Sequence, residues 1–182
     1  MPSFQESKSA QDILAFHCPR FQELPNIDLY MDQVISLADK YLSVFAGAEG
    51  DKSITSTMVN NYVKQKVIAP PSNKKYAREQ VACLLFICVA KQVLSISDIG
   101  RLLHIQQDTY SVEKAYDYFC TELELALQAV FGTRDFSHPN TASRITPETE
   151  LLRSTVMSFA HKIYVTKNLL YRQEMESSSG EA

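Results

Sequence analysis

The chain has 182 residues and is 45% hydrophobic, which is enough to bury a substantial core in one domain with a helical extension. It contains only five Gly and seven Pro, a scarcity of turn formers that favours long helices over a many-stranded sheet and predicts an all-α fold. The formal net charge is −3, the longest apolar run covers only residues 81–90, and residues 1–12 show no signal-peptide pattern, so we expect a cytoplasmic protein.

The first part of the chain predicts little order before one long helix. Residues 1–10 are polar and are expected to be disordered, and residues 10–16 suit a short helix. Asp28 is a good N-cap for a helix over residues 29–45, in which apolar side chains recur every three or four positions. Residues 47–52 contain two glycines and should form a loop after this helix.

The next segment predicts a second helix followed by a small wing. A helix over residues 55–65 must end before Pro70, because a residue that precedes proline avoids helical torsions. The polar, basic residues 72–76 lie between two short extended pieces, residues 67–68 and 76–77. This arrangement is typical of a small β-hairpin, or wing.

The rest of the chain is predicted to be largely helical. A buried helix carries the apolar run, a capping box opens the helix after it, and Thr146-Pro147-Glu148 opens the last one. These helices are predicted over residues 77–94, 95–103, 111–131 and 146–174. We expect a loop at residues 133–144 and a disordered tail at residues 177–182.

Charge is distributed unevenly along the chain. Residues 52–104 carry eight Lys or Arg and two acids, a net charge of +6, whereas residues 1–51 carry −5 and residues 105–182 carry −4. A basic segment between acidic flanks is typical of a module that binds a polyanion such as DNA. The alternative is a chance cluster of charges on a solvated face.

Four short motifs follow one another in the basic segment. They are Asn60-Asn61-Tyr62, Lys66-Val67-Ile68-Ala69-Pro70, Asn73-Lys74-Lys75-Tyr76 and Ser95-Ile96-Ser97-Asp98-Ile99. In order, spacing and residue class, residues 55–103 resemble the DNA-binding domain of MerR-type regulators. Asn60 and Asn61 stand where that family has an arginine and a tyrosine, and Lys66 stands where it has a turn glycine. The wider chain, from His17-Cys18-Pro19-Arg20 onward, resembles the YkrK-like family of uncharacterised bacterial proteins.

The resemblance implies a winged helix-turn-helix DNA-binding domain over residues 28–104. Residues 1–27 would be an N-terminal arm with a short helix, residues 105–176 a helical region for dimerisation or sensing, and residues 177–182 a tail. The expected partners are double-stranded DNA, a second copy of the chain and a small-molecule effector that the sequence does not identify. The alternative to a dimer interface is that the apolar stripes of the two C-terminal helices pack against the winged domain within one chain. The alternative is a protein-interaction module that reuses the winged fold without binding DNA.

The residue types of the basic segment suit DNA. In the major groove, asparagine can bond adenine and threonine can contact a thymine methyl group, while basic side chains reach phosphates. Tyr76 would either stack on a sugar or brace the wing. For the helix face, an ordinary solvated surface is the alternative. The predicted DNA contacts are Thr57, Asn60, Asn61, Lys64, Lys66, Asn73, Lys74, Lys75, Tyr76 and Arg78.

The sequence predicts no enzyme, metal site or cofactor. The four histidines are scattered, and the four cysteines form no CxxC pair and are expected to be reduced and mostly buried. Nucleotide-binding and hydrolase motifs are missing. Glu122 and Glu124 should lie on different helix faces and are therefore not expected to form an acid/base pair. An effector pocket, if formed by aromatic side chains, would draw on Tyr110, Tyr116, Tyr118 and Tyr164.

Overall fold

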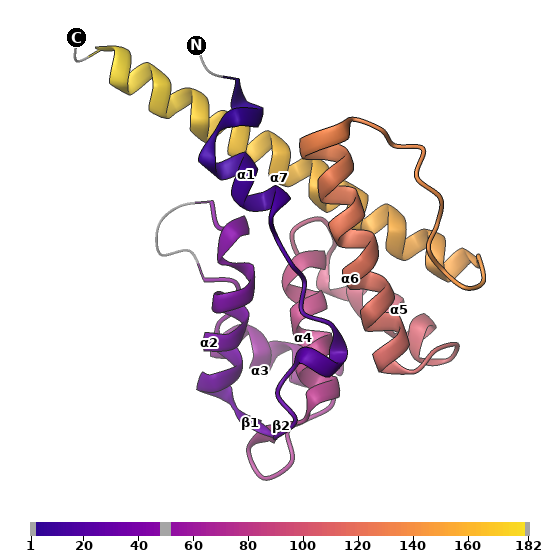
Figure 1. Ribbon diagram of the computed structural model, residues 1–182. Coiled ribbons are helices and arrows are strands. Elements are labelled where there is room, and N and C mark those ends of the chain that lie inside the picture. The colour runs from indigo at the N-terminus through magenta and orange to yellow at the C-terminus, as the bar shows by residue number, and fades with distance from the viewer. Residues whose placement is uncertain (1–2, 48–51, 181–182) are drawn as a thin grey trace.

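The computed structural model describes residues 3–47 and 52–180, and these residues are mostly helical, which confirms the all-α prediction (Figure 1). The α-helices are α1 (Lys8–Leu14), α2 (Met31–Leu42), α3 (Ser56–Lys64), α4 (Arg78–Ala90), α5 (Ile96–Gln107), α6 (Val112–Gln128) and α7 (Pro147–Gly180). Short 3-10 turns cover Phe4–Glu6 (η1), Phe21–Glu23 (η2) and Ser43–Phe45 (η3), and a π-helical turn covers Ala129–Thr133 (η4). The strands are β1 (Leu29–Tyr30) and β2 (Lys75–Tyr76).

The helix α4 lies at the centre of the fold. Nine of its thirteen residues are buried, which confirms the buried helix that the apolar run predicts. It packs against α2, α6 and α7, and the buried side chains from Phe4 to Ile163 form one hydrophobic cluster around it. The long helix α7 packs along α6, and its C-terminal part extends beyond the other helices (Figure 1).

The small sheet differs from the predicted wing. Strand β1 pairs with β2 in antiparallel register, with Leu29 opposite Tyr76, so residues 29–30 are a strand and not the first turn of a helix. The predicted pairing of residues 67–68 with 76–77 is wrong, because Val67 is held by the end of α3 and the two prolines after it have no N–H to donate. A two-residue turn at Asn73-Lys74 nevertheless forms and projects past the strands (Figure 1).

The N-terminal residues are ordered by their contacts, contrary to the predicted disorder of residues 1–10. Phe4 is 7% exposed, and its ring lies 5.3 Å from that of Tyr164 and 6.1 Å from that of Phe131. Ser7 caps α1 by accepting a hydrogen bond from the N–H of Ala10. Residues 1–2 lie outside the described part of the chain. A polar stretch with one well-placed aromatic residue is thus enough to fix this segment on the core.

The remaining helix boundaries agree with prediction to within four residues, except at the end of α7. Helix α4 ends at Ala90, four residues before the predicted end at residue 94. Helix α5 runs four residues past the predicted end at Leu103, and α7 continues to Gly180, so residues 177–180 are helical and not a disordered tail. Of the predicted loop at residues 47–52, residues 48–51 lie outside the described ranges, as do residues 181–182. None of the described helices combines the length and hydropathy that a membrane span requires.

The cysteines behave as packing residues. Cys18, Cys88 and Cys120 are buried, Cys83 is half-buried, and all four thiols are free, as predicted. Burial raises the pKa of Cys83 to about 11 and that of Cys88 to about 12. Both are therefore thiols, not thiolates, at neutral pH, and thiolates are the reactive form.

Candidate nucleic-acid interface

Helix α3 presents one buried side and one open side. Thr55 caps its N-terminus by accepting a hydrogen bond from the N–H of Met58 at 3.3 Å. Val59 and Tyr62 are 0% and 7% exposed and anchor the helix on the core. The opposite side, which we name the α3 face, is exposed and consists of Thr57, Asn60, Asn61 and Lys64. Within the described residues, none of these four side chains has a hydrogen bond or an ion pair.

The end of α3 is fixed by a Schellman motif in which Lys66 takes the position usually held by glycine. The N–H of Lys66 donates to the carbonyl of Val63, and the N–H of Val67 donates to that of Tyr62. Lys66 has a φ of 58°, in the left-handed region. This is the position at which the MerR-type pattern has a glycine, so the local backbone requirement is met here by a strained lysine with an exposed side chain.

The turn at residues 72–75, which we name the wing turn, has the geometry of a tight hairpin. Asn73 and Lys74 have φ angles of 49° and 63°, and Ser72 and Lys75 exchange backbone hydrogen bonds of 3.0 and 2.9 Å. Positive φ at both central residues is the signature of a type I′ turn, which matches the twist of antiparallel strands. Asn73 and Lys74 are exposed at its tip.

Contacts at its base hold the wing turn on the body. The side-chain amide of Gln80, at the start of α4, donates to the carbonyls of Ala69 and Pro70 at 2.9 and 3.1 Å. The ammonium group of Lys75 lies 4.8 Å from the centre of the Tyr30 ring, a cation–π contact between β2 and β1. The wing is therefore fixed at both of its ends, while its tip is open.

The structure separates two predicted DNA contacts from the other eight. Tyr76 is 1% exposed, so of its two predicted roles it has the one that braces the wing. Arg78 turns away from the wing: its Nη1 donates to Gln22 Oε1 at 3.0 Å, its Nε donates to the Pro25 carbonyl at 3.3 Å, and its guanidinium lies over the Phe21 ring. Neither side chain is free to reach a phosphate in this conformation.

The N-terminal arm is held by an ion-pair network that the sequence analysis missed. Arg20 donates to both carboxylate oxygens of Glu124 in α6, at 2.9 and 2.8 Å, and the N–H of Cys18 donates to the same carboxylate at 2.8 Å. His17 lies between Glu124 and Glu23. Burial alone would raise the pKa of Glu124, but its hydrogen bonds with Arg20 and Cys18 lower that pKa below its ordinary value.

The carboxylates of Glu122 and Glu124 lie apart, as predicted. Glu122 is 1% exposed and accepts hydrogen bonds from the N–H and hydroxyl of Thr141, with Arg153 Nε 3.3 Å from its second oxygen. It thus fixes the loop before α7, whereas Glu124 fixes the arm. Among the described residues there is also no cluster of three or more His, Cys, Asp or Glu that could hold a metal ion.

These observations define a mostly helical protein in which an open helix face and a hairpin turn, both carrying lysines, follow one another in the chain. The protein belongs to the family described as "Domain of unknown function (DUF1836)", whose sequence profile matches residues 19–119. The matched part contains the arm from Pro19, the α3 face and the wing turn, and it ends within α6. No curated protein and no solved structure matches the chain.

Proposed function

We propose that this protein is a DNA-binding transcription regulator of the winged helix-turn-helix type, similar to MerR-type regulators. The observation that carries the proposal is that the α3 face and the tip of the wing turn present amide and lysine groups that have no hydrogen-bond or ion-pair partner among the described residues. These groups are those of Asn60, Asn61, Lys64, Asn73 and Lys74. By contrast, the fold engages three arginines elsewhere, because Arg20, Arg78 and Arg153 all bind protein acceptors. A polar group that the fold leaves open is available to an external partner.

The order of elements supports this assignment. Strand β1 leads into α2, α2 packs against α3, and α3 leads through the wing turn into β2 and α4. In proteins with a helix-turn-helix, the second helix of the pair enters the major groove. In that position, α3 would direct Asn60 and Asn61 at base edges, since the asparagine amide can both donate to and accept from adenine.

Lysines would supply most of the affinity. Lys64, Lys66 and Lys74 are exposed and lack ion pairs within the described residues, so they are free to contact phosphates along the backbone. Such contacts fix the register of a protein on DNA and make its affinity salt-dependent. Lys75, which is half-buried beside Tyr30, contributes from the base of the wing. Tyr76 and Arg78 act by positioning the wing and the arm, not by contact with DNA.

Dimerisation through α7 belongs to the same proposal. Val165 and Leu169 are 56% and 58% exposed and are four residues apart, so they share one side of the helix. They lie in the C-terminal half of α7, and the end of this helix extends beyond the other helices (Figure 1). A symmetric pair would present two α3 helices to successive major grooves, about 34 Å apart. Light scattering of the purified protein measures this directly, and a monomer at micromolar concentration would contradict it.

Fluorescence anisotropy with a library of genomic duplexes, at several salt concentrations, tests the proposal. We expect salt-sensitive binding that Lys74→Glu with Lys75→Glu weakens on every sequence, while Asn60→Ala changes the sequence preference. The matched control is Lys8→Glu with Lys114→Glu, which alters net charge equally at two exposed positions outside the α3 face and the wing turn.

Three results would contradict the proposal. The first is no salt-sensitive DNA binding at micromolar protein. The second is an equal loss of DNA affinity in the wing and control variants, and the third is unchanged DNA binding in both the wing variant and Asn60→Ala. A stable protein partner that co-purifies without nucleic acid, and whose binding the wing variant abolishes, would instead support the protein-interaction alternative.

A further inference from the structure

The two-stranded ribbon of β1 and β2 has one buried side and one open side. Leu29 and Tyr76 pair across the ribbon and are 6% and 1% exposed, so they anchor one side on the core. The next pair, Tyr30 and Lys75, points to the other side, because successive side chains of a strand alternate between its two faces. Tyr30 is 48% exposed. We name the side chains of Tyr30 and Lys75 the ribbon face.

The ribbon face is held in place by contacts within the fold. The ammonium group of Lys75 lies 4.8 Å from the centre of the Tyr30 ring. The N–H of Tyr30 donates to Gln33 Oε1 at 2.9 Å, in the first turn of α2, and the wing turn with Lys74 at its tip leads directly into β2. Groups that are already ordered in this way lose little conformational freedom when they bind a partner.

The hydroxyl group of Tyr30 has no partner within the fold. The ring is engaged by Lys75, but no described residue forms a hydrogen bond with the hydroxyl. Asp28 and Asp32 are exposed two residues before and two residues after Tyr30, so the local charge alone does not attract an anion here. A neutral donor beside one fixed ammonium group suits a single phosphate of DNA, to which tyrosine and lysine side chains both donate.

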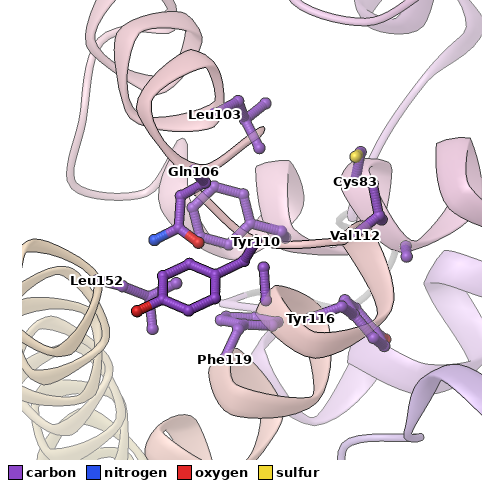
Figure 2. A pocket seen from close by; sticks show the side chains of 11 residues that line it. Cys83, Leu103, Gln106, Tyr110, Val112, Tyr116, Phe119 and Leu152 are labelled. Atoms are coloured by element: carbon purple, nitrogen blue, oxygen red, sulfur yellow. The ribbon is translucent and has the colours of Figure 1, made fainter. Parts of the chain in front are cut away.

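The pocket between α4, α5, α6 and α7 offers no such groups (Figure 2). Phe86, Phe119 and Leu152 are among its lining residues, and the accessible atoms of the described residues on its surface are all apolar. The ribbon face instead presents a hydroxyl donor and an ammonium group next to the wing turn. Polar recognition of a partner is therefore a property of the ribbon face and not of this pocket.

We infer that Tyr30 is a DNA contact, with its hydroxyl donating to a phosphate at the wing while its ring holds Lys75 in position. The inference rests on the proposed function and extends the DNA-facing surface from the wing turn onto β1. Because the contact is to the DNA backbone, it contributes equally on every sequence.

Tyr30→Phe tests the hydroxyl alone, because it keeps the ring and its contact with Lys75. Fluorescence anisotropy of the full-length protein with genomic duplexes should show an affinity about fivefold lower on every sequence, as expected for the loss of one hydrogen bond. The slope of log affinity against log salt should not change, since no charge is removed. The matched control is Tyr41→Phe. Tyr41 also has a lysine beside its ring, with Lys40 Nζ 5.8 Å from the ring centre, but it lies about 16 Å farther along α2 and should bind DNA as the native protein does.

A second variant, Tyr30→Leu, removes the ring as well, so Lys75 loses its position. We expect a larger loss of DNA affinity than in Tyr30→Phe, together with a smaller salt slope. Thermal unfolding followed by circular dichroism checks that each variant is folded at the temperature of the titration.

The possible outcomes separate this inference from the proposed function. If the native protein binds DNA and Tyr30→Phe binds equally well, the inference is overturned and the proposed function stands. The inference is also overturned if Tyr41→Phe loses as much affinity, if Tyr30→Leu loses no more than Tyr30→Phe, or if Tyr30→Phe lowers the salt slope, which indicates a displaced wing. If the native protein shows no salt-sensitive DNA binding, the proposed function fails and the inference fails with it.

Discussion

Residues 17–25 of the N-terminal arm and the surface made by the α3 face and the wing turn use similar side chains in opposite ways. In the arm, Arg20 is bound by both oxygens of Glu124, and Gln22 accepts a hydrogen bond from Arg78. On the α3 face, Asn60 and Lys64 are exposed and have no partner among the described residues. The comparison teaches that the charge of a segment says little about its availability, whereas the partners of each group decide it.

The same contrast separates stability from binding. The arm joins the start of α4 to α6, so its polar groups contribute to the free energy of unfolding. The α3 face and the tip of the wing turn contribute little to that free energy, because their exposed side chains lose no contacts when they are replaced. Substitutions in the two regions should therefore have different readouts, and this allows the comparison to be tested.

The largest effect is expected from Arg20→Ala in the arm. This change leaves the Glu124 carboxylate, whose side chain is 21% exposed, without its bidentate partner, and removing one member of such a pair costs about 3 kcal/mol of unfolding free energy. Urea denaturation followed by circular dichroism measures the loss. The control is Arg101→Ala. The Arg101 side chain is 78% exposed, and its Nη1 lies 3.6 Å from Asp98 Oδ1, so this is a surface ion pair. Such surface pairs contribute at most about 1 kcal/mol. Equal losses in the two variants would show that the arm is not a stabilising element.

The sequence was sufficient for the elements with a strong periodic or apolar signal. The run at residues 81–90 predicted the buried helix α4, and the spacing of the polar positions after Thr55 predicted the open side of α3. The strand β1 was missed because its two residues lie next to the apolar periodicity of α2, and only pairing with β2 makes them extended. A two-residue strand has no period of its own to detect.

Long-range partners explain the other misses. Arg78 lies near the wing in sequence, so its type and position predicted a phosphate contact, yet its guanidinium binds Gln22 and Pro25, more than fifty residues earlier. The Arg20–Glu124 pair spans 104 residues, and no local pattern predicts such a pairing. The eight remaining DNA contacts stay a prediction. Seven of these side chains are exposed, as contact with DNA requires, and the eighth, Lys75, is half-buried.

An intermediate effect is expected from the pH dependence of the arm. The pKa of Glu124 is lower in the folded chain than its ordinary value of 4.5, so this carboxylate stabilises the fold above that value. The contribution is lost as the pH falls from 4.5 through the lowered pKa. Glu124→Gln should cost about 1–2 kcal/mol near pH 7, and its difference from the native protein should shrink below pH 4.5. If the stability difference between Glu124→Gln and the native protein grew on acidification, the pairing would be contradicted. The matched control is Glu113→Gln, which changes a carboxylate that accepts a hydrogen bond from Gln22 at an exposed site.

The smallest effect sharpens the comparison, because one substitution should move stability and binding in opposite directions. Lys66 has a φ of 58°, where glycine is favoured, so Lys66→Gly should stabilise the fold by about 0.5–1 kcal/mol. It also removes one of the proposed phosphate contacts, which should weaken the proposed DNA binding about fivefold near physiological salt and reduce the salt slope by about 0.9. Lys64→Gly is the control: Lys64 is helical, so this change removes a charge two residues away but should destabilise by about 1 kcal/mol. If Lys66→Gly lowered stability as Lys64→Gly does, the left-handed end of α3 would be wrong; if it stabilised the fold and left DNA affinity unchanged, Lys66 would have no place in the DNA interface.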